Sequence, residues 1–231
     1  MSENIAAIIM LGKSGASKSE LLVHNARRKA AIHTIQKLSQ IEKVKNIIVA
    51  VPKQETSIWS EDSCFKHVSE NVNWDIDPAN RPFHFGSRIS EIVRKHNLKH
   101  VLYIGGGSMP LLRIEILEEI VDKLIKAQGK YAITNNFHSS DWLGITDGSV
   151  LPMLTKLLPR DNMLGWVLKN KGEFVVEALP PSAGTQLDID TPTDLVAMRW
   201  HPDTHSDMRS FLTKHLPYEP LVRWQEAARK L

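Results

Sequence analysis

The stretch VLYIGGGSMPLL, residues 101–112, joins a short apolar run to three consecutive glycines, a serine and a proline. Its β-branched and aromatic residues favour a buried strand, and the glycines end that strand. Glycine has no Cβ, so the backbone here can approach another group closely. A simple tight turn rarely needs three glycines in a row. The stretch therefore predicts a strand whose carboxyl end faces a ligand.

Strand and helix patterns alternate regularly up to residue 135. The expected strands cover residues 5–11, 44–51, 101–104 and 131–134, and the expected helices cover residues 21–41, 86–96 and 111–127. Buried strands that alternate with helices form βαβ units, with a parallel sheet covered on both faces. The sequence therefore predicts an α/β fold with right-handed crossovers.

The alternation is less regular after residue 135. Short strands are expected at residues 142–145 and 174–178, and helices at residues 151–158, 163–170 and 192–199. The tail, residues 206–231, has two helical pieces broken at Pro217 and Pro220. We expect one α/β domain over residues 1–200 and a C-terminal helical extension over residues 201–231, packed on the same domain.

The composition excludes several classes of protein. The chain has 231 residues, 42% of them hydrophobic, which suffices for one sizeable core. The net charge of +3 is mild and the basic residues are scattered, so no nucleic-acid partner is expected. The cluster Arg27-Arg28-Lys29 is first explained as a solvated helix face and second as a phosphate contact. A single cysteine, Cys64, allows neither an internal disulfide nor a cysteine metal cage.

No apolar run approaches the ~20 residues of a membrane-spanning helix, and the first residues lack the features of a signal peptide. We therefore expect a cytoplasmic protein without a membrane partner, either a monomer or a homodimer.

The loop LGKSGASKS, residues 11–19, lies between an expected strand and an expected helix. Glycines let backbone N–H groups approach an anion, and a helix N-terminus favours negative charge. Lys13 and Lys18 add positive charge. A phosphate-binding loop is the functional interpretation, and an ordinary strand-to-helix turn is the alternative. A P-loop would need a glycine where Ala7 stands.

The segment DIDTPTDL, residues 188–195, carries carboxylates at Asp188 and Asp190. Side chains two apart on an extended chain point the same way. Such a pair suits Mg²⁺, which takes few carboxylates and retains phosphate oxygens. The alternative is that one of them, or Thr191, only caps the following helix.

Two further polar clusters are TNNFHSSDW, residues 134–142, and PRDNMLGW, residues 159–166. Asn and Ser side chains can bind a base or a sugar, Asp141 can bind a metal or a hydroxyl, and Arg160 can bind a phosphate. A solvated loop is the alternative for both. The histidines show no H-x-E or H-E-x-x-H spacing, so no zinc site is expected.

In this order, the motifs resemble those of the MobA-like nucleotidyltransferases. IAAIIMLGKSGASKS is similar to a divergent form of the family's LAGG-x-S-x-R loop, IGGGSMPLL resembles GGD-x-PLL, and DIDTPTDL closely matches DIDTPEDL. The resemblance covers about residues 5–200. The family includes molybdenum cofactor, phospholactate and adenosylcobinamide-phosphate guanylyltransferases.

The resemblance implies a Rossmann-like, three-layer α/β/α nucleotidyltransferase (GT-A-like) fold with a mostly parallel sheet. It implies transfer of a nucleoside monophosphate, GMP favoured, from a nucleoside triphosphate (NTP), GTP favoured, to a phosphorylated small-molecule acceptor. Mg²⁺ or Mn²⁺ assists, and pyrophosphate leaves.

The resemblance and the polar clusters together assign roles to individual residues. The predicted nucleotide-binding residues are Leu11, Gly12, Lys13, Ser14, Gly15, Gly105, Gly106, Gly107 and Ser108. The predicted catalytic residues are Lys18 and Asp190, the predicted metal ligands are Asp188 and Asp190, and the predicted acceptor-binding residues are Asn135, Asn136, His138, Asp141 and Arg160.

Two departures from the family pattern leave other functions open. Ser108 stands where the family has an aspartate, and Lys13 stands at the second glycine of the first loop. One alternative is a nucleotide-binding protein of the same fold with weak or lost catalysis. Another is a nucleotide-sugar glycosyltransferase, although such enzymes normally place an acidic D-x-D motif where this chain has GGGS.

Overall fold

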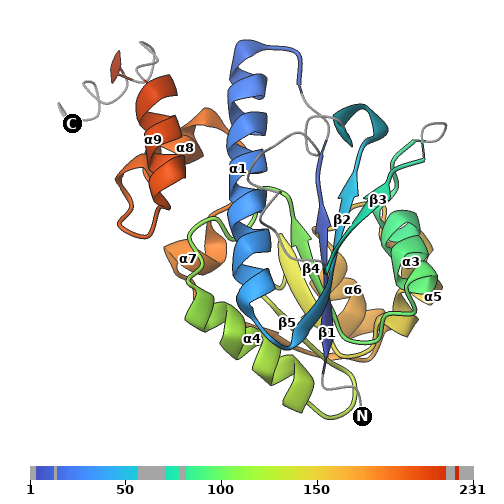
Figure 1. Ribbon diagram of the computed structural model, residues 1–231. Coiled ribbons are helices and arrows are strands. Elements are labelled where there is room, and N and C mark those ends of the chain that lie inside the picture. The colour runs from blue at the N-terminus through green and yellow to red at the C-terminus, as the bar shows by residue number, and fades with distance from the viewer. Residues whose placement is uncertain (1–3, 13–14, 57–70, 79–81, 217–221, 224–231) are drawn as a thin grey trace.

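The computed structural model describes residues 4–12, 15–56, 71–78, 82–216 and 222–223. At its centre lies a seven-stranded sheet in the order β3-β2-β1-β4-β6-β5-β7 (Figure 1). The strands are β1 (Ile5–Met10), β2 (Val44–Val51), β3 (Val72–Ile76), β4 (Val101–Gly105), β5 (Tyr131–Thr134), β6 (Trp142–Ile145) and β7 (Val175–Ala178). β6 runs antiparallel to β4 and β5, and the other pairings are parallel. The expected mostly parallel α/β sheet is confirmed.

Helices cover both faces of the sheet (Figure 1). They are α1 (Lys18–Gln40), α3 (Phe85–Lys95), α4 (Ile114–Lys126), α5 (Leu151–Leu154), α6 (Leu164–Lys171), α7 (Ala183–Gln186), α8 (Pro192–Trp200) and α9 (Ser206–His215), with the short 3-10 helices η1 (Lys53–Glu55), η3 (Gly148–Val150) and η4 (Thr155–Leu157). Within the part of the chain that the structure describes, we find no helix with the length and apolar character needed to cross a bilayer.

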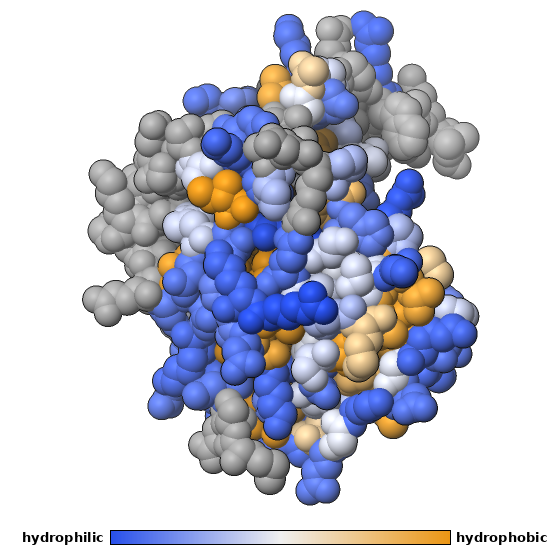
Figure 2. Space-filling model, turned by 90° about the vertical axis from the view of Figure 1, so that its right-hand side faces the viewer, coloured by the Kyte–Doolittle hydropathy of each residue, from blue (hydrophilic) through white to orange (hydrophobic). Residues whose placement is uncertain are grey.

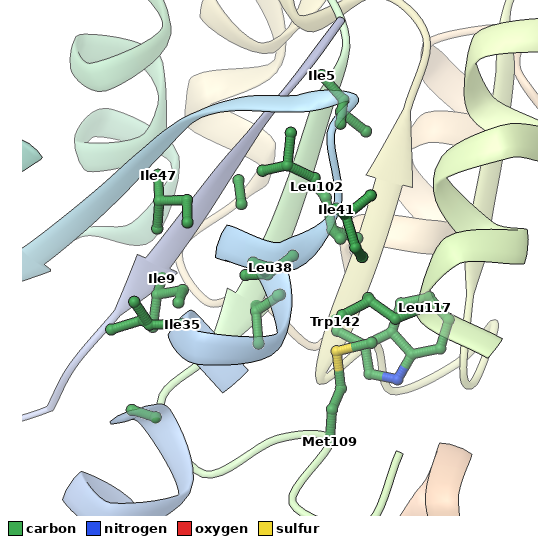
Figure 3. Packing of buried hydrophobic residues seen from close by; sticks show 14 of the residues in the cluster. Ile5, Ile9, Ile35, Leu38, Ile41, Ile47, Leu102, Met109, Leu117 and Trp142 are labelled. Carbon is green, nitrogen blue, oxygen red and sulfur yellow. The ribbon is translucent and has the colours of Figure 1, made fainter. Parts of the chain in front are cut away.

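The apolar strands fill two cores because successive side chains of a strand point to opposite faces. Ile9 of β1 packs on one face with α1 and α4, and the next residue back, Ile8, packs on the other face with α3, α5 and α6. In Figure 3, Ile35 and Leu38 of α1 lie over the sheet beside Ile9 and Ile47. The two cores fix the sheet between its helical layers.

Trp142 of β6 is fully buried and links the sheet to the loop after β4 and to α7. The side chain of Met109 lies beside its indole (Figure 3), a favourable sulfur–aromatic contact. The indole Nε1 donates a hydrogen bond to the carbonyl of Thr185 at 3.2 Å. The chain just before residues 188–195 is thereby anchored to the sheet.

α8 and α9 lie beside α1 (Figure 1) and form a third apolar cluster with it. Its buried members are Val23, Ala26, Ala30, Leu111, Ile189, Leu195, Met198, Met208, Leu212 and Leu216. α9 belongs to the predicted C-terminal extension, of which the structure describes residues 201–216 and 222–223. The domain boundary at residue 200 stays a prediction.

Two features differ from the sequence-based expectation. β3 is an edge strand in which only Asp75 is fully buried, so it has no apolar run to reveal it. α4 begins at Ile114 rather than at residue 111, because Leu111 and Leu112 are buried loop residues and the Leu112 N–H donates to the Met109 carbonyl at 3.1 Å. On the face drawn in Figure 2 hydrophilic residues predominate and separate the hydrophobic areas.

Candidate functional site

A cavity of about 930 Å³ opens at the carboxyl ends of β1, β2 and β4. From β1 the chain proceeds outward through β2 to β3, and it returns on the other side of β1 as β4. This reversal between β1 and β4 is the position at which open α/β sheets bind ligands. The cavity is lined by residues 10–12 and 105–108 at the two strand ends, by residues of the first half of α1, and by residues 159–162, 188 and 190–192.

The glycines after β4 make room for other parts of the chain as well as for a ligand. A Cβ on Gly106 would lie 2.9 Å from Leu11 Cδ2 and 3.0 Å from the Met10 carbonyl oxygen, at the end of β1. A Cβ on Gly107 would lie 2.7 Å from Asp188 Oδ1. Neither glycine has a positive φ. Close packing, rather than an unusual backbone conformation, therefore requires glycine at both positions.

The acidic segment is paired directly with this glycine stretch. Ser108 and Asp188 form an isolated antiparallel bridge, and the Ile189 N–H donates to the Gly107 carbonyl at 3.2 Å. Ile189 is fully buried, whereas Asp188 and Asp190 line the cavity. The alternation of an extended chain thus brings both carboxylates to the same side, as predicted from their spacing.

Helix capping is carried out by residues other than these two carboxylates. The Asp194 carboxylate accepts hydrogen bonds from the backbone N–H groups of Asp190 and Thr191, at 3.0 and 2.6 Å, and from the Thr191 hydroxyl at 2.9 Å. Asp194 stands in the first turn of α8, where a negative charge is favourable. The carboxylates of Asp188 and Asp190 are therefore left for another role.

Arg27 connects α1 to the acidic segment. Its guanidinium donates to the Asp190 carboxylate and to the Ile189 carbonyl oxygen, and it lines the cavity together with Arg28. Of the two interpretations of the basic cluster, solvated face and phosphate contact, the structure places these two arginines where the second is possible. Lys29 turns away, with its ammonium 5.7 Å from the centre of the Phe211 ring.

Asp141 adds a third carboxylate to this end of the cavity. The Asn135 amide donates to Asp141 Oδ2 at 2.6 Å, and the Ser108 hydroxyl donates to the Asp141 carbonyl at 2.9 Å. Burial raises the pKa of Asp141, and the hydrogen bond from Asn135 partly opposes that rise. Ser108 thus links the loop after β4 to Asp141 through a hydroxyl.

Burial raises the pKa of the Asp188 carboxyl to about 6, and the neighbouring Asp190 and Asp141 charges add to the effect, while Arg27 opposes it. A raised carboxyl pKa means that the protein's own positive charges and hydrogen bonds do not offset the cost of burying the ionised carboxylate. A bound cation would stabilise the ionised carboxylate by supplying positive charge.

The remaining wall carries polar pairs. The Tyr103 hydroxyl donates to Asp161 Oδ2 at 2.6 Å, and His24 Nε2 lies 3.1 Å from Glu55 Oε2. Asp161 does not cap α6, which begins after Met163 without a side-chain cap. Sequence reasoning missed these pairs because each joins residues far apart in the chain.

The carboxylates fit a hard divalent cation, because Mg²⁺ and Mn²⁺ prefer oxygen ligands. Among the described residues, the cavity acids are not gathered into a set of three whose ligand atoms lie within 4.8 Å of one another. Mg²⁺ is commonly held by only one or two carboxylates together with substrate phosphates. Asp188 and Asp190 match that mode of binding.

Most of the predicted site residues face the cavity. Its lining includes Leu11, Gly12, Gly15, Gly105, Gly106, Gly107, Ser108, Asp141, Arg160, Asp188 and Asp190. Lys13 and Ser14 lie outside the described residues.

Four predicted residues are not among the described residues that line the cavity. Lys18 and His138 are exposed. The Asn135 side chain is engaged with Asp141, and Asn136 Oδ1 accepts from the His138 N–H at 2.9 Å. Their roles stay predictions.

Neither a family model nor a curated protein matches this chain. Among solved structures, it is similar to a cytidylyltransferase from Leptospira borgpetersenii serovar Hardjo-bovis, with 19% identity over 91% of this chain and 93% of that chain and a TM-score of 0.60. It is also similar to CMP:2-keto-3-deoxy-manno-octonic acid synthetase complexed with CTP, with 12% identity, coverage of 84% and 96%, and a TM-score of 0.55.

A third similar structure is Rv0371C from Mycobacterium tuberculosis H37Rv in complex with manganese, with 13% identity over 85% of this chain and 98% of that chain and a TM-score of 0.51. At these identities the similarity establishes a shared fold. The expected nucleotidyltransferase-like α/β fold is therefore confirmed.

Proposed function

We propose that this protein is a nucleotidyltransferase, which transfers a nucleoside monophosphate from an NTP to a small-molecule acceptor. One observation carries the proposal: the segment that contains Asp188 and Asp190 is paired with the glycine-rich end of β4, and both carboxylates face one cavity at the switch point of the sheet. This arrangement offers a place for a nucleotide and oxygen ligands for a cation in the same space.

In the proposed reaction an acceptor oxygen attacks the α-phosphorus. The new O–P bond forms as the bond to the β-phosphate bridging oxygen breaks, and pyrophosphate leaves. Such chemistry depends mainly on positioning and on stabilisation of phosphate charge. Arg27 and Arg28 are the cavity cations on α1 that we assign to the phosphates, and Arg160 at the rim is assigned to a phosphate of the acceptor.

Asp188 and Asp190 are the residues that would hold Mg²⁺ or Mn²⁺, which would neutralise phosphate charge. The manganese complex of a protein with this fold supports a metal in this role. Asp141 holds the Ser108 loop through its carbonyl and keeps the acidic end of the cavity assembled.

Two nucleobases are considered for the donor NTP. The sequence resemblance favours GTP, whereas the similar structures named as a cytidylyltransferase and as a CTP complex favour CTP. We therefore propose these two nucleotides as the leading donors, and a phosphorylated small molecule or a sugar acid as the acceptor.

A second candidate function is nucleotide binding without turnover. Ser108 replaces the acid of the related family, and the Arg27 guanidinium already pairs with Asp190. A cation at Asp190 would have to share its carboxylate with that guanidinium.

The test is pyrophosphate release from each of the four NTPs, with Mg²⁺ or Mn²⁺ and a panel of phosphorylated and sugar-acid acceptors. Asp190→Asn should lower turnover by about 100-fold or more, because metal stabilisation of phosphate charge is worth several kcal/mol. It should leave metal-free NTP binding in place. Asp203→Asn, an exposed change outside the cavity lining, is the control.

Full turnover in the Asp190→Asn variant would remove the role assigned to this carboxylate. NTP binding without pyrophosphate release under every condition would favour the second candidate function.

A further inference from the structure

Two imidazoles and a carboxylate meet where α9 packs against α1, away from the cavity. His33 lies on α1, His205 is the N-cap residue of α9, and Asp207 stands in the first turn of that helix. The imidazole centres of His33 and His205 are 3.8 Å apart, and one ligand atom from each of the three residues lies within 4.8 Å of the others. None of these three described residues lines the cavity.

The apolar packing of α1 brings the three residues together. Ala26 and Ala30 of α1 pack against Met208 and Leu212 of α9. His33 follows Ala30 at the helical spacing of three and therefore continues the same face of α1. The start of α9 must accordingly lie over His33.

The donor set matches a first-row transition-metal cation. Two imidazole nitrogens and one carboxylate oxygen are common Zn²⁺ ligands, with water in the fourth position of a tetrahedral site. Imidazole also distinguishes this set from the all-oxygen acids of the cavity, which suit Mg²⁺ or Mn²⁺. A histidine ligates a metal through a neutral imidazole nitrogen.

The geometry needs only a small adjustment to close around an ion. Two ligand atoms about 2.1 Å from a tetrahedral Zn²⁺ lie roughly 3.4 Å apart. His205 and Asp207 are exposed and can rotate toward the half-buried His33. The Asp207 N–H donates to His205 Nδ1 at 3.3 Å. Ligation through Nε2 would place the imidazole proton on Nδ1, so this long hydrogen bond would be lost when the ion binds.

We propose that His33, His205 and Asp207 bind one Zn²⁺ ion, which fastens α9 to α1. The site lacks a recognisable zinc spacing in the sequence because its ligands come from opposite ends of the chain. The ion would stabilise the folded chain, because the ligands converge only when α9 has docked. This proposal does not depend on the proposed nucleotidyltransferase activity.

The experiment titrates Zn²⁺ into full-length, untagged protein that has been freed of metal. Wild-type protein should bind one equivalent of Zn²⁺ by calorimetry, and its melting temperature should rise with Zn²⁺. His33→Gln and His205→Asn should each weaken Zn²⁺ binding by at least about tenfold and remove most of the rise. Asn is itself a good N-cap residue, so His205→Asn preserves the start of α9.

One control separates this site from other sources of binding. His215→Asn alters an exposed histidine at the other end of α9 and should leave Zn²⁺ binding unchanged. Wild-type protein that binds no Zn²⁺, or His33→Gln and His205→Asn variants that bind it as tightly as wild type, would overturn the proposal. The metal-free melting temperatures of both variants should match wild type, which shows that any loss of binding is not a loss of fold.

Discussion

At the scale of the single residue, Asp188 shows a conflict between burial and charge. Its carboxyl is largely buried beside Asp190 and Asp141, with Ser108 Oγ 3.4 Å from its Oδ1. A pKa raised from its ordinary value of 3.8 to about 6 means that the folded protein binds a proton here more tightly than the unfolded chain does. The metal-free protein should therefore lose stability as the pH rises from about 4 through about 6.

Asp188→Asn should remove this pH-dependent loss. We expect the metal-free variant to be more stable than wild type by about 1–3 kcal/mol at pH 7.5, where the wild-type carboxyl is ionised. The difference should disappear near pH 4, where Asp188 is protonated in the folded protein. Urea unfolding at both pH values, with a chelator present, measures the effect. An equal difference at both pH values would show that the change acts through packing instead of charge.

Arg27 should affect the binding of two ligands in opposite directions: it weakens the binding of a metal cation and strengthens the binding of an NTP. Arg27→Met should raise the affinity of Asp190 for Mn²⁺ alone, because a competing cation is removed. The same change should weaken metal-free NTP binding by about 1.5–3 kcal/mol, the worth of a charged hydrogen bond to phosphate. Stability should change by less than about 1 kcal/mol, since both side chains of the pair are more than one-third exposed.

Lys29→Met is the matched control for this prediction, because it removes the same charge from a neighbouring residue that points to Phe211. Titration of Mn²⁺ and of NTP, each alone, distinguishes the two effects. If both affinities fall in the Arg27→Met variant, Arg27 only supports the local structure.

At the scale of the element, the adjacent ends of β1 and β4 place glycine in two different settings. A Cβ on Gly106 would meet the end of β1, whereas a Cβ on Gly12 has no atom within 4 Å. Both residues line the cavity. The same substitution at the two positions therefore distinguishes a glycine that close packing requires from a glycine that leaves room for a ligand.

Gly106→Val should destabilise the protein by about 1–3 kcal/mol, the typical result of overpacking. Gly12→Val should leave stability within about 0.5 kcal/mol, and it should weaken NTP binding because its side chain enters the cavity. Denaturant unfolding and NTP titration of both variants give the comparison. A destabilised Gly12→Val variant with normal NTP affinity would contradict the assignment of that glycine to ligand space.

The sequence predicted the strands in which consecutive residues are apolar and buried. The bounds expected for β2, β5 and β6 agree with the structure, because each is an apolar run that ends at polar or proline residues. β3 escaped prediction because it is a half-exposed edge strand, and its buried Asp75 is held by contacts with Arg88 and Lys95 that no local pattern reveals.

The same distinction applies to the site. The glycine stretch and the acidic segment carry local signals, and the structure pairs them. Arg27 resembles any basic residue on a helix surface until α1 docks against residues 188–192. The His33, His205 and Asp207 group likewise depends on helix packing alone. Tertiary contacts between distant segments are the part that local patterns do not encode.

At the scale of the whole molecule, the cavity should couple ligand binding to global stability. A ligand at 100 times its Kd adds about 2.7 kcal/mol to the stability of the folded state. For a chain of this size, that corresponds to a rise in melting temperature of about 5–11 °C. A thermal-shift panel of the four NTPs, with and without Mn²⁺, should show the rise most clearly for the true donor. No shift with any NTP would argue against a nucleotide site.

The pairing of Ser108 with Asp188 also bears on how the protein is made. These residues are separated by 80 positions in the chain. At about 5–20 residues per second, a ribosome takes roughly 4–16 s to add the intervening residues. Throughout that interval β1, β2 and β4 have been synthesised, but the segment that contains Asp188 and pairs with the end of β4 has not. The nascent chain can thus form much of its parallel sheet early, but it acquires Asp188 and Asp190, the carboxylates assigned to the metal, only after these 80 further positions have been added.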